Sequence, residues 1–295
     1  MKNISLKSSM LLFLAAFIWG VAFVAQSVGM DYMGPLSFNG ARFLMGSVVL
    51  LPLVIYRRQK NRKEGIPAAD TKIIIKGGIC CGLALCAAAL LQQYGIMYTT
   101  VGKAGFITTL YIIMVPIFGI FLKKRVPGKV WIGAGIAAFG MYLLCMSERL
   151  ALSKGDELVF ICAIIFSVHI LVIDYFSPKA DGVEISCIQF LTAGVIASIG
   201  ALLFENPQLG QFIAGIIPLA YAGILSSGVA YTLQVVGQKN VEPTVASLIL
   251  SLESVVSMLA GWVILHQALT GRELFGCVLV FAAVILVQLP DKKKV

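Results

Sequence analysis

Long runs of apolar residues, separated by short polar segments, recur along the whole chain. A bilayer core needs roughly 20 apolar residues in a helix, whereas the strands of membrane barrels alternate and are about 9 to 11 residues long. The runs are therefore predicted transmembrane helices. We expect ten of them, at residues 10–30, 36–56, 73–98, 104–122, 130–147, 158–176, 185–204, 211–236, 244–265 and 272–289.

The ten predicted helices fall into two similar sets of five, in residues 1–147 and 148–295. At an offset of 147 residues Phe43 matches Phe190, and turns and glycines recur in the same order in both sets. Because five is odd, the second set enters the membrane from the opposite side. The sequence therefore predicts an all-α integral membrane protein of two inverted five-helix repeats, an arrangement typical of secondary transporters.

Composition and charge agree with a membrane location. Of the 295 residues 59% are hydrophobic and 13% are charged, with a mean hydropathy of +0.94, whereas soluble domains carry about 25% charge. With both termini in the cytoplasm, 18 of the 23 lysines and arginines lie on that side and four on the other, with Arg42 inside a helix. The positive-inside rule therefore predicts cytoplasmic termini in a bacterial inner membrane, and no nucleic-acid partner.

Several segments resemble a known family of carriers. The stretch SLESVVSMLAGWVILHQALTGRELFGCVLVFAAVILV at 251–287 is similar to the closing helices of EamA-type carriers in the drug/metabolite transporter superfamily. So are IWG around residue 19, ARF at 41–43 and KAGFITTLYIIMVP at 103–116. The resemblance covers nearly the whole chain. It implies ten helices in two EamA repeats, and movement of small metabolites, often outward, without ATP.

Glu253 is the acidic residue that lies deepest in a predicted helix, about ten residues into the ninth. Charged groups at such depth are rare and mark functional sites. An apolar setting favours the protonated carboxyl, which suits coupling to protons, while the ionised form suits capture of a substrate amine. Ser254 and Ser257 share its polar sector. The alternative is a hydrogen-bonded carboxyl that closes a helix interface.

Three basic or titratable residues are further candidates. Arg42 lies inside the second predicted helix, where it would bind a substrate carboxylate or phosphate, or else bond Asn39 and neighbouring carbonyls. His169 is the histidine inside a predicted span, and its role is either coupling or neutral packing. Lys103 lies at the outer mouth of the fourth helix, where it attracts anions or is simply solvated.

Uncharged polar groups gather on helices three, four, eight and nine. Gln92 and Gln234 match at an offset of 142, with Tyr94 and Tyr231 nearby, and Tyr111 lies on helix four. Amides next to aromatic faces suit an amphipathic metabolite in a central cavity. Ordinary hydrogen bonding between helices is the alternative for each of them.

Small residues and prolines indicate where helices pack and bend. Gly77, Gly78 and Gly82 predict a close approach between helices. Pro116 and Pro218 are expected to interrupt helices four and eight.

The chain lacks the motifs GxxxxGK[ST], HExxH and GxSxG, so it carries no signature of an ATPase, a zinc protease or a serine hydrolase. We expect no catalytic residue, cofactor or metal. The primary hypothesis is a secondary active exporter of small amphipathic metabolites, such as an amino acid, a nucleoside or a drug-like compound. Its partners would be that substrate, the lipid bilayer, protons or another coupling ion, and a second copy in a homodimer. The alternatives are a translocator of a lipid-linked or sugar-linked substrate, and a membrane enzyme or receptor.

Overall fold

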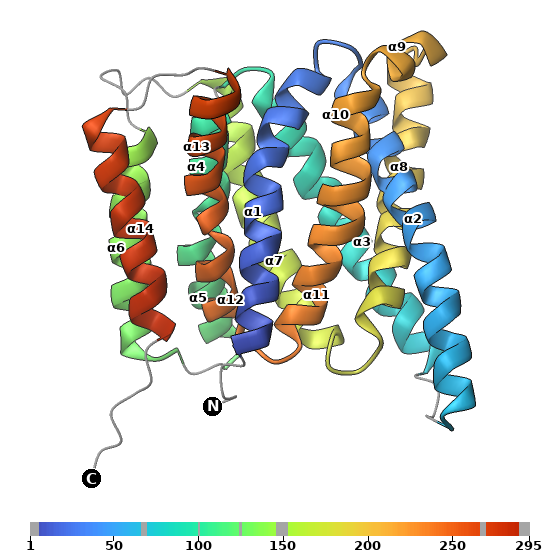
Figure 1. The fold of residues 1–295 in the computed structure, drawn as a ribbon, viewed down its shortest axis with the longest axis horizontal. Helices are drawn as coiled ribbons and strands as arrows, with labels where there is room; N and C mark the ends of the chain where they lie inside the picture. The colour runs from blue at the N-terminus through green and yellow to red at the C-terminus, as the bar shows by residue number, and fades with distance from the viewer. Residues whose placement is uncertain are drawn as a thin grey trace.

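The computed structural model describes residues 6–65, 70–99, 101–123, 126–145, 153–265 and 270–288, and every regular element in these ranges is a helix (Figure 1). The prediction of an all-α membrane protein is confirmed. Within the described ranges, eight segments are long and apolar enough to cross a bilayer. Ten crossings in two repeats therefore stay a prediction.

The first four of these segments are α1 (Leu6–Gly29), α2 (Pro35–Lys63), α3 (Thr71–Ile96), and α4 with α5 (Val101–Thr109 and Tyr111–Phe121). The fifth and sixth are α7 (Lys154–Phe176) and α8 (Gly182–Phe204). The seventh runs from α10 (Ile216–Ala220) through the π-helix η1 (Tyr221–Tyr231) to α11 (Thr232–Gln238), and the eighth joins α12 and α13 (Pro243–Leu250 and Leu252–Leu265). The short helix α9 (Leu209–Ala214) precedes α10, and α6 (Gly128–Cys145) packs on α14 (Gly271–Gln288) at one edge of the bundle (Figure 1).

Polar capping residues explain where several helices begin. Ser153 accepts a hydrogen bond from the amide of Asp156, whose carboxylate accepts one from the amide of Ser153, and this capping box starts α7. The side chain of Asp181 accepts hydrogen bonds from the amides of Val183 and Glu184 and so caps the first turn of α8. Pro35 and Pro243 occupy the first turns of α2 and α12, where the missing N–H breaks no helical bond.

Helices α2 and α8 are joined at both ends by polar side chains. At one end Glu205 accepts hydrogen bonds from the amides of Leu36 (2.9 Å) and Ser37 (2.8 Å) and from the Ser37 hydroxyl (2.6 Å). The residue before α2 is a glycine, so Glu205 caps α2 from the neighbouring helix. At the other end Arg58 donates two hydrogen bonds to Glu184, at 2.9 and 2.7 Å. These contacts fix the two helices against each other.

Three of the crossing segments are irregular near their middle. The segment of α4 and α5 breaks at Leu110 and the segment of α12 and α13 breaks at Ser251. The hydroxyl of Thr109 donates to the carbonyl of Phe106 (2.8 Å), and that of Ser251 donates to the carbonyl of Leu248 (2.7 Å). Hydroxyls that bond back to their own helix favour bends. The third irregularity is η1, whose length is unusual because π-helices mostly occur as single turns.

The sequence misplaced one of these irregularities and the start of one predicted span. Pro116 lies inside the continuous helix α5, so the prediction that it interrupts the fourth segment is wrong; the break lies at Leu110. The predicted span 211–236 is also wrong at its start, because α9 ends at Ala214 and the crossing segment begins at Ile216. Pro218 lies in α10, shortly before η1 begins. Neither break has a proline at its position. A hydroxyl bonds back to a carbonyl at each, but the same bond occurs inside continuous helices, as at Ser167 in α7, so a sequence does not reveal where a break falls.

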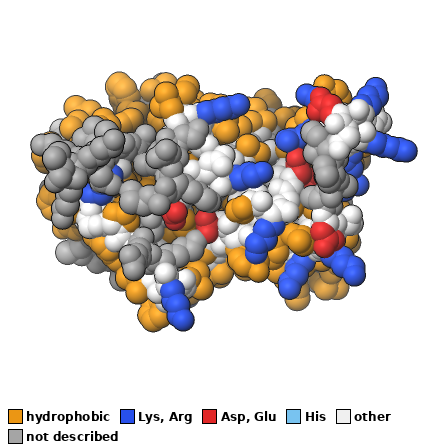
Figure 2. Space-filling model, turned by 90° about the horizontal axis from the view of Figure 1, so that it is seen from below, with side chains coloured by type: hydrophobic (Ala, Val, Ile, Leu, Met, Phe, Trp, Pro, Cys, Tyr) orange, Lys and Arg blue, Asp and Glu red, His pale blue; other side chains and the backbone are white. Residues whose placement is uncertain are grey.

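The first and last described helices share one face of the bundle. Helix α1 begins and α14 ends on the lower face in Figure 1. Seen from that side, Lys and Arg side chains gather around a smaller number of acidic ones (Figure 2). We call this the basic face. The side of the bundle is apolar instead, with Leu202 74% and Phe204 81% exposed, as expected for a surface in contact with lipid.

Gly82 offers a test of the helix packing. A Cβ atom at Gly82 would lie 2.6 Å from Cβ of Thr192 and 2.7 Å from the carbonyl oxygen of Gln189 on α8. We expect Gly82→Ala to lower the free energy of unfolding by about 1–3 kcal/mol, because α3 and α8 must separate. Gly135 in α6 has nothing within 4 Å of the same position, so Gly135→Ala should be neutral or slightly stabilising. Thermal unfolding of both variants in detergent provides the measurement, and equal melting temperatures would contradict this packing.

Candidate functional site

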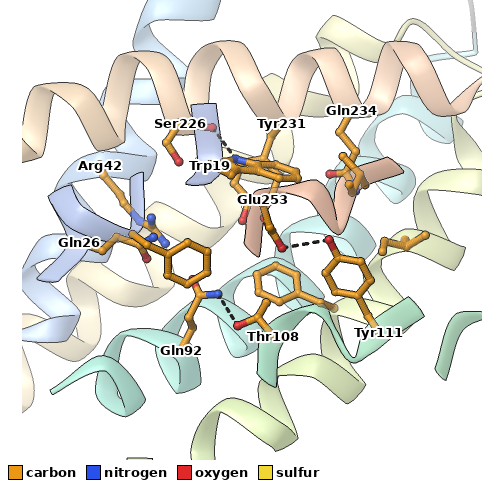
Figure 3. Close-up of a pocket in the computed structure, with 14 residues that line it drawn as sticks. Trp19, Gln26, Arg42, Gln92, Thr108, Tyr111, Ser226, Tyr231, Gln234 and Glu253 are labelled. Atoms are coloured by element: carbon orange, nitrogen blue, oxygen red, sulfur yellow. Dashed lines mark hydrogen bonds between the residues drawn. The ribbon is translucent and has the colours of Figure 1, made fainter. Parts of the chain in front are cut away.

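A small polar cavity lies where the irregular segments meet (Figure 3). Its volume is about 30 Å³, which leaves room for only one or two water molecules. Six of its residues are polar or charged candidates from the sequence: Arg42, Gln92, Tyr111, Tyr231, Gln234 and Glu253. The remaining lining residues are Trp19, Phe23, Gln26, Thr108, Phe166, Ile170, Ser226 and Leu250.

Arg42 on α2 provides the positive charge of the cavity. Its side chain is only 1% exposed. Its Nε donates to Oδ1 of Asn39 at 3.0 Å, and the guanidinium lies 4.5 Å from the centre of the Phe43 ring. In the described part of the chain, no acidic side chain forms an ion pair with it. A buried cation without a carboxylate is unfavourable, and a planar guanidinium is suited to hold a carboxylate.

Glu253 on α13 provides the acidic group of the cavity, two residues after the break at Ser251. Its side chain is 4% exposed, and Oε1 accepts a hydrogen bond from the hydroxyl of Tyr111 at 3.0 Å. Tyr111 in turn directly follows the break at Leu110. The two broken segments therefore meet in the Tyr111–Glu253 hydrogen bond. Both charged candidates, Arg42 and Glu253, lie in the wall of the same cavity (Figure 3).

Three amide side chains line the cavity, and two of them have unused acceptors. Nε2 of Gln92 donates to Oγ1 of Thr108 at 3.1 Å. Within the described residues, Oε1 of Gln26 and Oε1 of Gln234 are buried and have no hydrogen-bond partner. Buried polar atoms are normally paired. These two oxygens are therefore available to a donor group in the cavity.

Trp19 connects α1 to the π-helix. Its indole Nε1 donates to the main-chain carbonyl of Ser226 in η1 at 3.2 Å. Its ring centre lies 4.5 Å from that of Tyr231, with the planes inclined by 59°. The irregular backbone of η1 thus supplies a carbonyl that a side chain satisfies. Aromatic faces next to charged groups are typical of sites for amphipathic ligands.

Two predicted site residues are buried in the bundle but do not line the cavity. His169 bonds Oε1 of Gln189 at 3.2 Å through Nε2 and packs against the ring of Tyr231. The hydroxyl of Ser254 donates to the carbonyl of Ser251 at 2.7 Å. The sequence correctly places Ser254 near Glu253, but its hydroxyl is already used by its own helix.

Two other predicted site residues also lie outside the cavity. Nζ of Lys103 lies 3.9 Å from Oδ2 of Asp156, and Oγ1 of Thr99 donates to the same carboxylate at 2.5 Å. These contacts connect the start of α4 to the start of α7. Tyr94 is partly buried on α3, and the cavity does not include it. No group of three His, Cys, Asp or Glu side chains suited to a metal ion occurs in the described ranges.

Sequence reasoning missed the contributions of α1 and α7. We expected helices three, four, eight and nine to form the cavity, yet Trp19, Phe23 and Gln26 come from α1, and Phe166 and Ile170 come from α7. Aromatic and aliphatic residues in an apolar helix do not reveal which neighbour they face. The one available signal was Gln26, an amide within an otherwise apolar run.

The fold is that of an integral membrane protein, and a small polar cavity lies inside its helix bundle. The chain belongs to the EamA-like transporter family, whose model matches residues 6–146 and 153–289. It resembles an uncharacterized transporter of Archaeoglobus fulgidus, at 29% identity over 94% of this chain and 84% of that protein. It also resembles the uncharacterized inner membrane transporter YedA of Escherichia coli K12, at 23% identity over 94% and 89% of the two chains. One crystal structure shares the fold, with a TM-score of 0.76 at 17% identity over 95% of this chain and 96% of its own.

The buried charge of Arg42 should reduce stability. We expect Arg42→Met to leave the free energy of unfolding unchanged or to raise it by about 1–2 kcal/mol, because replacing an unpaired buried cation by an apolar chain removes a desolvation penalty. Arg58→Met is the matched control. It breaks the bidentate pair with Glu184 and should lower stability, by up to about 1 kcal/mol because Arg58 is more than half exposed. Denaturant unfolding of both variants measures these free energies. A clear loss of stability in Arg42→Met would assign Arg42 a structural role.

Proposed function

We propose that this protein is a secondary active exporter of small amphipathic metabolites that carry a carboxylate and an amino group. The observation that carries the proposal is that one buried basic and one buried acidic side chain, Arg42 and Glu253, line the same cavity of a transporter-family fold. Charged groups inside a membrane protein mark substrate and ion pathways. Membership of a transporter family fits the same interpretation.

Each polar group of the cavity suits one part of such a substrate. Arg42 would hold the carboxylate through its guanidinium. Glu253, together with the free oxygens of Gln26 and Gln234, would accept hydrogen bonds from the amino group. Trp19 and the neighbouring aromatic rings would contact an apolar body. This division of roles supports a zwitterionic amphipathic substrate over a lipid-linked or sugar-linked one.

The size of the cavity supports alternating access. A volume of about 30 Å³ does not admit a metabolite, so the cavity would have to widen for a substrate to bind. The breaks at Leu110 and Ser251 and the π-helix all border the cavity, and helix termini and irregular segments are where such motions take place. We infer that bending at these points opens the site to one side at a time.

Matched contacts support the inverted-repeat arrangement. At an offset of 147 residues, Ser37 corresponds to Glu184 and Arg58 corresponds to Glu205. The contact of Ser37 with Glu205 at one end of the α2–α8 pair therefore corresponds to the contact of Glu184 with Arg58 at the other. Similarly, α1 packs on η1, α11 and α13, while α7 packs on α3, α4 and α5. The two separate matches to the family model support the same division.

Coupling would arise because a proton and the substrate amino group compete for Glu253. When the site faces an acidic exterior, the carboxyl of Glu253 takes up a proton and releases the substrate amine. The site then returns to the inside with Glu253 protonated, and the proton is released there. Export would then be driven by a proton gradient that is acidic outside. The test is a flux measurement on liposomes that contain only this protein, loaded with a mixture of amino acids, nucleosides and organic acids. Loss of zwitterionic solutes under an acidic outside pH supports the proposal; movement of only lipid-linked molecules, or no flux, overturns it.

Glu253→Gln separates coupling from binding shape. The amide keeps the size of the side chain but does not carry a proton, so transport should lose its dependence on the pH gradient and proceed only down the substrate gradient. Glu242→Gln is the control, because Glu242 lies at the start of α12 outside the cavity. It should keep full pH dependence. If Glu253→Gln remains as pH-dependent as the wild type, Glu253 is a structural residue.

The distribution of charge also predicts the orientation. We expect both termini in the cytoplasm, because 18 of the 23 basic residues would then lie on that side. Reporter fusions at each end, one active only inside and one only outside, provide the measurement. Both termini outside would contradict the orientation, and termini on opposite sides would contradict the even number of crossings as well.

A further inference from the structure

A lateral apolar groove lies between α5 and α7, apart from the polar cavity. Its volume is about 460 Å³. Phe118, Phe121 and Leu122 line one side, and Val168, Leu171 and Tyr175 are among the residues that line the other. Phe121 is 80% exposed and Tyr175 is 60% exposed, so the groove opens at the side of the bundle. It is a feature of the surface that faces lipid.

The bilayer determines what fills this space. Water does not hydrate an apolar groove at hydrocarbon depth, and packed interiors rarely leave space of this size empty. The groove lies along the last turns of α7, which ends at Phe176. The molecules available at the side of the bundle are phospholipids, whose acyl chains are apolar. The apolar lining of the groove matches such a chain.

Positive charge lies at the same end of the groove. Nζ of Lys179 lies 3.0 Å from the centre of the Tyr175 ring, and Lys76 on α3 interacts electrostatically with Tyr175. Lys123 directly follows Leu122, and Asp174 is the acidic residue next to Tyr175 in the chain. Basic pockets at the ends of transmembrane helices bind anionic headgroups.

We propose that the groove between α5 and α7 is a binding site for an anionic phospholipid, with one acyl chain against Val168 and Phe121 and the headgroup phosphate at Lys179. A lysine near the membrane surface contributes about 1 kcal/mol towards an anionic lipid, which corresponds to about a fivefold preference. This site is independent of the transported substrate.

Native mass spectrometry tests the proposal with two lipids of identical acyl chains. The purified protein, mixed with equal amounts of anionic phosphatidylglycerol and neutral phosphatidylcholine in detergent, should retain phosphatidylglycerol about fivefold more than phosphatidylcholine. Val168→Trp should abolish retention by filling the groove. Val195→Trp on α8 is its matched control, because Val195 is 42% exposed and Val168 is 43% exposed, and it should retain the lipid.

The role of charge is tested separately. Lys179→Gln should keep one bound lipid but bring the ratio of the two lipids close to one, whereas Lys63→Gln, at the end of α2, should leave the preference unchanged. If Val168→Trp melts at a lower temperature than the wild type, Val172→Trp, which fills the same groove, is used in its place. Equal retention of both lipids by the wild type, or unchanged retention in a groove-filling variant, overturns the proposal. Light scattering that shows a dimer dissociated by Val168→Trp also overturns it, because the occupant would be a second copy.

Discussion

The absence of hydrogen-bond partners in hydrocarbon is the constraint on which this structure depends. A regular helix satisfies its own main chain, so the lipid-facing surface consists of helices with apolar side chains. Irregular backbone is tolerated only where the protein itself surrounds it. The breaks at Leu110 and Ser251 and the π-helix Tyr221–Tyr231 all border the central cavity. The outer side of the π-helix is exposed and carries apolar side chains, such as Ile224 and Leu225. Side chains then satisfy the altered backbone, as Trp19 does for the carbonyl of Ser226.

The same constraint makes the unpaired polar groups of the cavity informative. Arg42 has an amide and aromatic rings as neighbours but no carboxylate, and the acceptors of Gln26 and Gln234 are unused within the described residues. Elsewhere the protein pairs its charges well, as in the contact of Arg58 with Glu184. Unused acceptors also occur away from the cavity, as on Gln93 and Gln238. What distinguishes the cavity is that two such amides line it together with a buried cation.

The sequence was sufficient for the helices and for the most unusual residues, because both depend on local composition. Glu253 and Arg42 were identifiable since charges inside apolar runs are rare. Which face of a helix meets which neighbour depends on packing across the whole chain, so the places of Trp19 and Phe166 in the cavity were not predictable. The hydroxyl of Thr109 bonds back to its helix at the break at Leu110, whereas that of Ser167 does so within the continuous helix α7, so the residue type alone did not place the break. Ser254 shows the same limit, because its position was predicted and its hydrogen bond was not.

Matched positions in the two halves carry different chemistry. Phe43 and Phe190, which match at an offset of 147, stack with their ring centres 6.2 Å apart and their planes within 3°. Next to them stand Arg42 and Gln189, a cation in one half and a neutral amide bonded to His169 in the other. Only one half therefore offers a guanidinium to an anionic group, and the other offers an amide. The difference concerns binding within the cavity, because the gradients of the solutes, and not the asymmetry of the halves, set the direction of net movement through a carrier.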